Sequence, residues 1–135
     1  MNVKSFLKYS SISAAAAFLF SVSAPAQAPQ MVLLNGLQKG SWTLKERGSS
    51  DASTNICLGD ARRLLQIEHG NVQCTRYIIE DTPTNLRVSY KCGSLGHGVT
   101  NIRRESSNLV QIQTQGIANK APFSIAFEGR RTGSC

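Results

Sequence analysis

The sequence predicts a mainly β domain, an antiparallel meander of five to seven short strands that form a curved sheet or an incomplete barrel, with one short α-helix. Three observations predict it. Stretches of alternating apolar and polar residues recur along the chain, and turn-forming residues separate them at short intervals. The length of 135 residues is that of one domain. Successive short strands joined by tight turns form an antiparallel sheet.

Residues 1–26 have the composition of a cleaved secretory signal peptide. Lys4 and Lys8 precede a short apolar run, residues 12–22, and the sequence A-P-A follows at residues 24–26. A basic start, a short apolar stretch and small residues at A-x-A spacing are the three parts of such a leader. The run is shorter than the roughly 20 residues that a bilayer-spanning helix needs. We therefore expect no stable membrane span.

The rest of the chain is expected to hold an N-terminal tail at residues 27–36 and a single disulfide-stapled β domain at residues 37–135. A leader of this kind indicates export, either to the periplasm or out of the cell. The first strand is predicted over residues 37–47, where Trp42 and Leu44 share one face and polar residues alternate with them. A short second strand is predicted over residues 54–58.

One α-helix is predicted over residues 60–69. Asp60 is placed to cap its N-terminus, and Gly70 is placed to end it. Three apolar residues at helical spacing form a stripe that can face the core: Ala61, Leu64 and Leu65.

A hairpin is predicted next, from residues 71–80 and 84–92 around a turn that contains Pro83. The expected register pairs residue 80 with residue 86. Alternation then places three apolar side chains on the inner face of the second strand, namely Leu86, Val88 and Tyr90.

The four cysteines are expected to form two disulfides because an exported chain meets oxidising conditions. The hairpin register also pairs Cys74 with Cys92, and a slip of two residues keeps both on one face. The favoured connectivity is therefore Cys74–Cys92 with Cys57–Cys135. The alternative, Cys57–Cys74 with Cys92–Cys135, stays open.

The C-terminal part is predicted to complete the sheet. After a glycine-rich turn at residues 93–98, strands are expected over residues 99–105 and 109–115. The inner face of the strand at residues 99–105 is not assigned by its pattern. The last strand alternates three apolar residues with polar or small ones, and these three are Phe123, Ile125 and Phe127.

Short motifs occur in a fixed order along the predicted domain. They are G-S-W at residues 40–42, C-L at 57–58, Cys74, Y-K-C at 90–92 and G-R-R-T-G-S-C at 129–135. In this order they resemble the domain-of-unknown-function 3617 family of small exported bacterial proteins, in which a G-x-W strand and a terminal Gly-x-Cys bracket two central cysteines. The resemblance covers roughly residues 37–135. It implies a periplasmic or secreted bacterial protein, gives Trp42 and the four cysteines structural roles, and implies no activity.

The chain is basic, with 15 Lys and Arg against 8 Asp and Glu. Six basic residues on predicted strands form a candidate cationic patch for an anionic partner: Arg87, Lys91, Arg103, Arg104, Arg130 and Arg131. Such a patch suits an anionic lipid, a polysaccharide or an acidic protein of the envelope. A solvated surface that keeps a small domain soluble explains the same residues. Export and the shortage of stacking aromatics argue against nucleic acid.

No catalytic motif is found. There is no G-x-S-x-G nucleophile turn, and the glycine-rich turn lacks the Gly-Lys-Ser/Thr of a phosphate loop. His97 has the chemistry of a general base, but no nucleophile is identifiable beside it. A Cys₂His₂ zinc site of His69, Cys74, Cys92 and His97 is the sharper alternative. We expect no enzyme, no metal and no cofactor.

Two functions follow from these patterns. The first is a non-catalytic binding module that holds a small or anionic ligand on the concave side of the sheet. The second is a structural or interaction protein of the cell envelope without a small ligand. A large apolar pocket inside the sheet favours the first, and a filled interior with one exposed patch favours the second.

Overall fold

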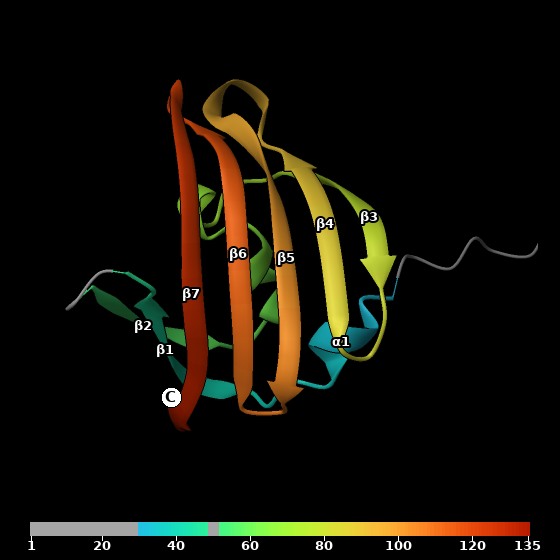
Figure 1. The fold of residues 1–135 in the computed structure, drawn as a ribbon, viewed down its shortest axis with the longest axis vertical. Helices are drawn as coiled ribbons and strands as arrows, with labels where there is room; N and C mark the ends of the chain where they lie inside the picture. Colours follow the sequence, from blue (N-terminus) through green and yellow to red (C-terminus); the bar gives the residue numbers. More distant parts are fainter. Residues whose placement is uncertain (1–29, 49–51) are drawn as a thin grey trace, which may run out of the picture.

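The computed structural model describes residues 30–48 and 52–135, so the predicted leader at residues 1–26 lies outside the described residues. Within the described residues, seven antiparallel strands form one curved, unclosed sheet (Figure 1). The predicted fold class is therefore confirmed. In the described part of the chain, no helix is long and apolar enough to cross a membrane.

The sheet has the order β2-β1-β7-β6-β5-β4-β3. The strands are β1 (Gly40–Glu46), β2 (Ser53–Leu58), β3 (Thr75–Asp81), β4 (Asn85–Lys91), β5 (Gly96–Ser106), β6 (Leu109–Ala118) and β7 (Ala121–Gly133). Strands β3 to β7 follow one another as a meander. The hairpin of β1 and β2 pairs with β7, which brings the first and last strands of the chain together (Figure 1).

One face of the sheet, called here the inner face, carries the core. The strands bury on it Trp42, Leu44, Leu58, Leu86, Val88, Ile102, Val110, Ile112 and Phe127. Two short helical segments cover these side chains, α1 (Val32–Asn35) and the 3₁₀ helix η1 (Ala61–Leu65). In Figure 1 the segment between β2 and β3, drawn in green, lies behind β5 and β6. The inward positions predicted for Trp42, Leu44 and the apolar residues of β4 are correct.

The α-helix predicted over residues 60–69 is wrong in type. The chain forms η1 and a second 3₁₀ helix, η2 (Ile67–His69), and the helical path is interrupted at Gln66, with φ −138° and ψ 47°. The Gln66 side chain is buried, and its amide donates to the carbonyls of Gly70, at 2.9 Å, and Val72, at 2.7 Å. These bonds satisfy a buried polar group, which a continuous helix would leave without partners.

The α-helix of the structure lies in the segment predicted as a tail at residues 27–36. Leu33 and Leu34 of α1 are buried in the core, so the folded unit includes residues before position 37. The start of α1 is fixed by the Val32 backbone N–H, which donates to Asp81 Oδ1 at 2.8 Å. Apolar burial explains why this segment folds onto the sheet.

The β3–β4 hairpin forms with one difference from the predicted register. Near the cysteines the pairing is the expected one, with Thr75 opposite Lys91. Near the turn, Glu80 pairs with Arg87 instead of residue 86, because a β-bulge at Ile79 inserts one residue into β3.

The two disulfides are Cys74–Cys92 and Cys57–Cys135, the connectivity that the hairpin register favours. The first joins the start of β3 to the end of β4, with a Cα–Cα distance of 4.2 Å. The second joins β2 to the end of the chain after β7, across the intervening β1. Disulfides of this kind persist in oxidising, non-cytoplasmic environments.

Candidate functional site

A pocket opens on the inner face, between the β2-β1-β7 side of the sheet and the 3₁₀ helices η1 and η2. Its volume is about 380 Å³, within the range of small-molecule sites. We call it the inner pocket. It is lined by Leu44 and Glu46 of β1, Thr54 and Ile56 of β2, Ile125 and Phe127 of β7, and Arg63, Ile67, Glu68, Gly70 and Asn71 of the 3₁₀ segment.

Five of the eleven residues that line the inner pocket have large apolar side chains. Leu44 and Phe127 belong to the buried core, while Ile56, Ile67 and Ile125 pack against that core and stay partly exposed. Strand alternation explains the floor, because side chains two residues apart on one strand share a face. The protein therefore leaves three aliphatic side chains incompletely covered at one place.

Three charged residues also line the inner pocket, and both signs are present. Glu46 lies at the end of β1, and Arg63 and Glu68 come from the 3₁₀ segment. The Arg63 guanidinium is held at one end, since its Nη1 donates to the Cys57 carbonyl at 2.9 Å. An apolar interior with a few polar groups at the mouth orients a ligand by its polar end.

The structure does not bring the six basic residues of the predicted patch together as one free cationic surface. Two of them point their guanidinium groups at backbone carbonyls. Arg104 Nη1 donates to Gly36 O at 3.3 Å, and Arg131 Nε donates to Lys39 O at 2.8 Å. These two residues tie the chain before β1 to the sheet.

Two further members of that patch form ion pairs. Arg103 pairs with Glu105 at 2.9 Å, and Arg130 pairs with Glu128 at 3.3 Å. A hydrogen bond from Gln111, together with the Arg130 guanidinium, holds the pKa of Glu128 below its usual range, so the carboxylate stays charged. These pairs cancel much of the positive charge at both positions.

Arg87 and Lys91 remain on the outer face of β4, where they alternate with the buried residues of that strand. Arg103 lies diagonally across from Arg87, since it pairs with Asn85 on β4. The outer face therefore carries a smaller cationic group than the sequence predicts.

The four residues of the alternative zinc site do not offer a ligand set. Cys74 and Cys92 are bonded to each other, which removes both thiolates. His69 contacts the Tyr90 hydroxyl through Nδ1 at 3.2 Å and the Ile117 carbonyl through Nε2 at 3.1 Å. His97 is exposed on β5 opposite Lys91.

Threonines that the sequence did not assign to a face form a buried polar link between the sheet and η1. Thr100 Oγ1 contacts the Leu65 carbonyl at 2.7 Å and Thr114 Oγ1 at 2.9 Å. Burial raises the pKa of the Tyr90 hydroxyl, and a hydrogen bond with Thr114 acts against this shift. This link holds the 3₁₀ segment against the sheet and so positions one wall of the inner pocket.

No family model, no curated protein and no solved structure matches the chain. The lining residues of the inner pocket were missed from the sequence because they come from four separate segments. The signal that points to them is the alternation of Ile125 and Phe127 in the last strand, which shows the floor but not the opening.

Proposed function

We propose that this chain is an exported, non-catalytic binding module that holds a small, mainly apolar ligand in the inner pocket. One observation carries the proposal: the inner face leaves Ile56, Ile67 and Ile125 partly uncovered around a cavity of about 380 Å³. Apolar surface removed from water contributes about 25 cal/mol per Å². A ligand that covers these side chains therefore gains binding free energy from groups that the fold itself leaves exposed.

The chemistry of the lining supports binding without catalysis. The described residues that line the inner pocket include no histidine or cysteine. Its charged groups are Glu46, Arg63 and Glu68, and the Arg63 guanidinium already donates to a backbone carbonyl. This composition is that of a site that recognises a shape and one polar end.

Export is part of the same proposal. The leader composition of residues 1–26 and the two disulfides both support it. Membership of the domain-of-unknown-function 3617 family, proposed from the order of the short motifs, also fits a small periplasmic protein.

The test uses the neutral fluorophore N-phenylnaphthylamine, whose emission rises in apolar surroundings. We expect saturable binding with one site per chain. Ile125→Trp fills the inner pocket and should weaken binding by about tenfold or more, since a lost pocket contact of 1.4 kcal/mol is a tenfold change. Ile79→Trp is the matched control, because Ile79 lies on the edge strand β3 with 49% of its surface exposed.

Urea unfolding of both variants, followed by circular dichroism, checks that each one is folded. The proposal is overturned if the folded wild-type protein does not bind the fluorophore, or if Ile125→Trp binds it as tightly as Ile79→Trp does.

A second function, an interaction protein of the cell envelope, is supported by a different observation. Tyr77 is 72% exposed and Ile79 is 49% exposed, and both lie on β3, the edge strand of the sheet that the described residues form. Exposed apolar side chains beside an unpaired strand edge suit a protein partner. Chemical crosslinking in the envelope distinguishes the two functions, since it captures a partner through β3 only under this second one.

A further inference from the structure

A second cleft lies beside the Cys74–Cys92 disulfide, and three of its ten lining residues are arginines. Its volume is about 320 Å³, and it is lined by Arg62, Arg63 and Arg76 together with Asp60 and Gln66. We call it the arginine cleft. Arg63 lines both this cleft and the inner pocket. None of the three arginines belongs to the basic patch predicted from the sequence.

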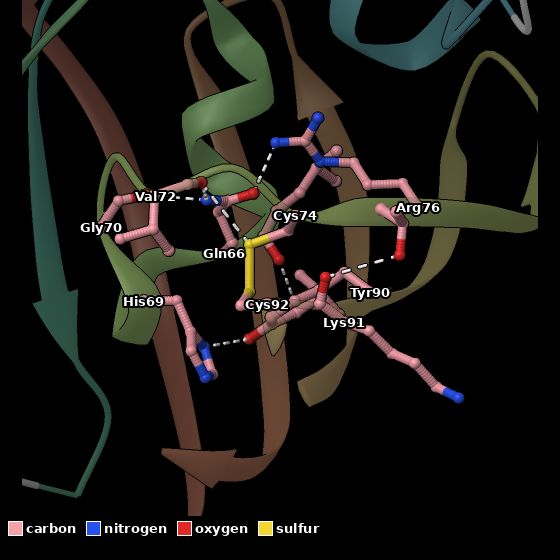
Figure 2. Close-up of a disulfide and its surroundings, with 12 residues drawn as sticks. Gln66, His69, Gly70, Val72, Cys74, Arg76, Tyr90, Lys91 and Cys92 are labelled. Atoms are coloured by element: carbon pink, nitrogen blue, oxygen red, sulfur yellow. Dashed lines mark hydrogen bonds between the residues drawn. A yellow bond between two sulfur atoms is a disulfide. The ribbon is translucent and has the colours of Figure 1, made fainter. Parts of the chain in front are cut away.

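The Arg76 guanidinium is held in place by the buried side-chain amide of Gln66. Gln66 is 3% exposed, and its Nε2 donates to the carbonyls of Gly70 and Val72. Both amide hydrogens point at carbonyl oxygens, so the orientation of the amide is fixed. Its Oε1 accepts a hydrogen bond from Arg76 Nη2, as Figure 2 shows. One edge of the guanidinium is thus anchored, and its other donors form no hydrogen bond with the residues that the structure describes.

The other two arginines are anchored in different ways. Arg63 donates from Nη1 to the Cys57 carbonyl at 2.9 Å, which fixes one end of its guanidinium. Arg62 binds Asp60, with Nη2 at 2.8 Å from Oδ2. The hydrogen bond from Arg62 holds the pKa of Asp60 below its usual range, so Asp60 is a carboxylate that offsets the charge of Arg62. Among the described residues, neither Arg63 nor Arg76 forms an ion pair with a carboxylate, and Asp60 attracts Arg76 only through space.

Two such guanidinium groups in one cleft favour the binding of an anion. Guanidinium presents planar, paired donors that match the oxygens of phosphate, sulfate or carboxylate. Anchoring each group at one end lowers the entropy lost when a ligand binds. Arg63 comes from η1 and Arg76 from β3, and two arginines from different elements can each bind a different pair of oxygens on a tetrahedral anion, whereas a carboxylate has only one such pair.

We propose that the arginine cleft binds a phosphate or sulfate group between Arg63 and Arg76. The group is either a free anion or the anionic end of an organic ligand. Because Arg63, Gly70 and Asn71 line both cavities, an alkyl chain attached to the anion has the inner pocket beside it. Binding of the free anion does not depend on the inner pocket, so it is independent of the function proposed above.

The first experiment is calorimetric titration of the mature protein with inorganic phosphate and with inorganic sulfate at constant ionic strength. Arg63→Met and Arg76→Met should each weaken binding by about tenfold or more, as expected for a lost charge-assisted hydrogen bond. Arg87→Met is the matched control, since it removes the same charge from the outer face of β4. Its binding constant should stay within about twofold of that of the wild type.

Arg76→Met removes the guanidinium that donates a hydrogen bond to Gln66 Oε1. Because this loss can lower the stability of the fold, unfolding by urea is measured for each variant. Arg63→Met leaves that buried amide untouched and tests the cleft by itself. The proposal is overturned if neither anion binds the wild type, or if Arg87→Met weakens binding as much as the two cleft variants do.

Hexyl phosphate distinguishes the two sources of the anionic group. If the ligand is an amphiphile, hexyl phosphate binds more tightly than inorganic phosphate, and Ile125→Trp removes only that gain. If the ligand is a free anion, the two bind equally and Ile125→Trp changes neither. In both cases Arg63→Met weakens binding. If hexyl phosphate binds tightly and Arg63→Met does not weaken that binding, the proposal is contradicted.

Discussion

Tyr90 occupies a closely fitted position on the inner face. Its ring packs edge-on against His69, with ring centroids 5.3 Å apart, and its hydroxyl contacts His69 Nδ1. The neighbouring strand makes room for it with Gly98. A Cβ atom built on Gly98 stands 2.5 Å from the Tyr90 hydroxyl and 2.6 Å from the ring carbon that bears it. The small residue is needed there because the tyrosine ring lies over the backbone of β5.

Gly98→Ala is therefore expected to lower the free energy of unfolding by about 1–3 kcal/mol, the usual cost of overpacking a close-packed core. Urea unfolding followed by the fluorescence of Trp42, the only tryptophan of the chain, measures it. Gly59→Ala is the control, since a Cβ there meets nothing within 4 Å. Equal stability of the two variants would contradict the packing described here.

Tyr90 also makes stability depend on alkaline pH. Burial raises the pKa of its hydroxyl, so the neutral form is favoured in the folded protein. Above the usual tyrosine range, the unfolded chain has lost this proton while the folded chain still holds it. Unfolding then releases a proton, and the free energy of unfolding falls as pH rises.

Tyr90→Phe removes that titration. Urea unfolding at a series of alkaline pH values should show a shallower loss of stability for Tyr90→Phe than for the wild type, although the variant starts from a lower stability because the contact with His69 is lost. Parallel pH profiles for the two proteins would show that Tyr90 titrates normally.

The strands and hairpins follow closely from the sequence, while the covering segments do not. Alternation in β4 shows which side chains are buried, because Leu86, Val88 and Tyr90 are spaced two residues apart and therefore share one face of the strand. The β-bulge at Ile79 corresponds to no such pattern in the sequence, since it depends on how β3 pairs with β4. The interruption of the helical path at Gln66 could not be predicted from the sequence for a similar reason. Only the folded chain brings the carbonyls of Gly70 and Val72 to the Gln66 amide.

The two disulfides constrain segments of different length. Cys57–Cys135 closes a separation of 78 residues, and Cys74–Cys92 closes one of 18 residues. In the chain-entropy model these loops correspond to about 4.5 and about 3.2 kcal/mol of stabilisation.

Replacing Cys57 and Cys135 together by alanine should thus cost about 1 kcal/mol more than replacing Cys74 and Cys92. Urea unfolding of the two double variants measures the difference. Cys92 is buried and Cys74 is partly buried, whereas the other two cysteines are exposed. A larger loss for the shorter loop would mean that packing around Cys92, rather than chain entropy, sets the contribution of that bridge.

At the scale of the whole molecule, the candidate sites depend on which segments meet. Sequence patterns gave basic residues on strands as a candidate patch for an anionic partner, yet Arg104 and Arg131 tie the chain before β1 to the sheet. Arg62 and Arg63 of the cleft come from η1, and Arg76 comes from β3, 13 to 14 residues further along the chain. The fold of the segment between β2 and β3 places these arginines together, so no spacing in the sequence predicts the arginine cleft.

The same segment forms one wall of the inner pocket and the floor of the arginine cleft. It is held to the sheet by Leu64 and Leu65 in the core and by the contact of Thr100 with the Leu65 carbonyl. The two cavities are therefore parts of one architecture, a curved sheet with a short covering segment. The proposed ligand binds where that cover leaves the inner face open.

The central claim is that this molecule is an exported protein that carries a ligand in its inner pocket. The most direct test is the mass of the protein purified from the periplasm, measured under native and then denaturing conditions, for the wild type and for Ile125→Trp. We predict a denatured mass lower by two hydrogens for each of the two bridges. We also predict an extra native mass on the wild type that denaturation releases and that Ile125→Trp lacks. An empty wild-type chain, with equal native and denatured masses, would contradict the claim.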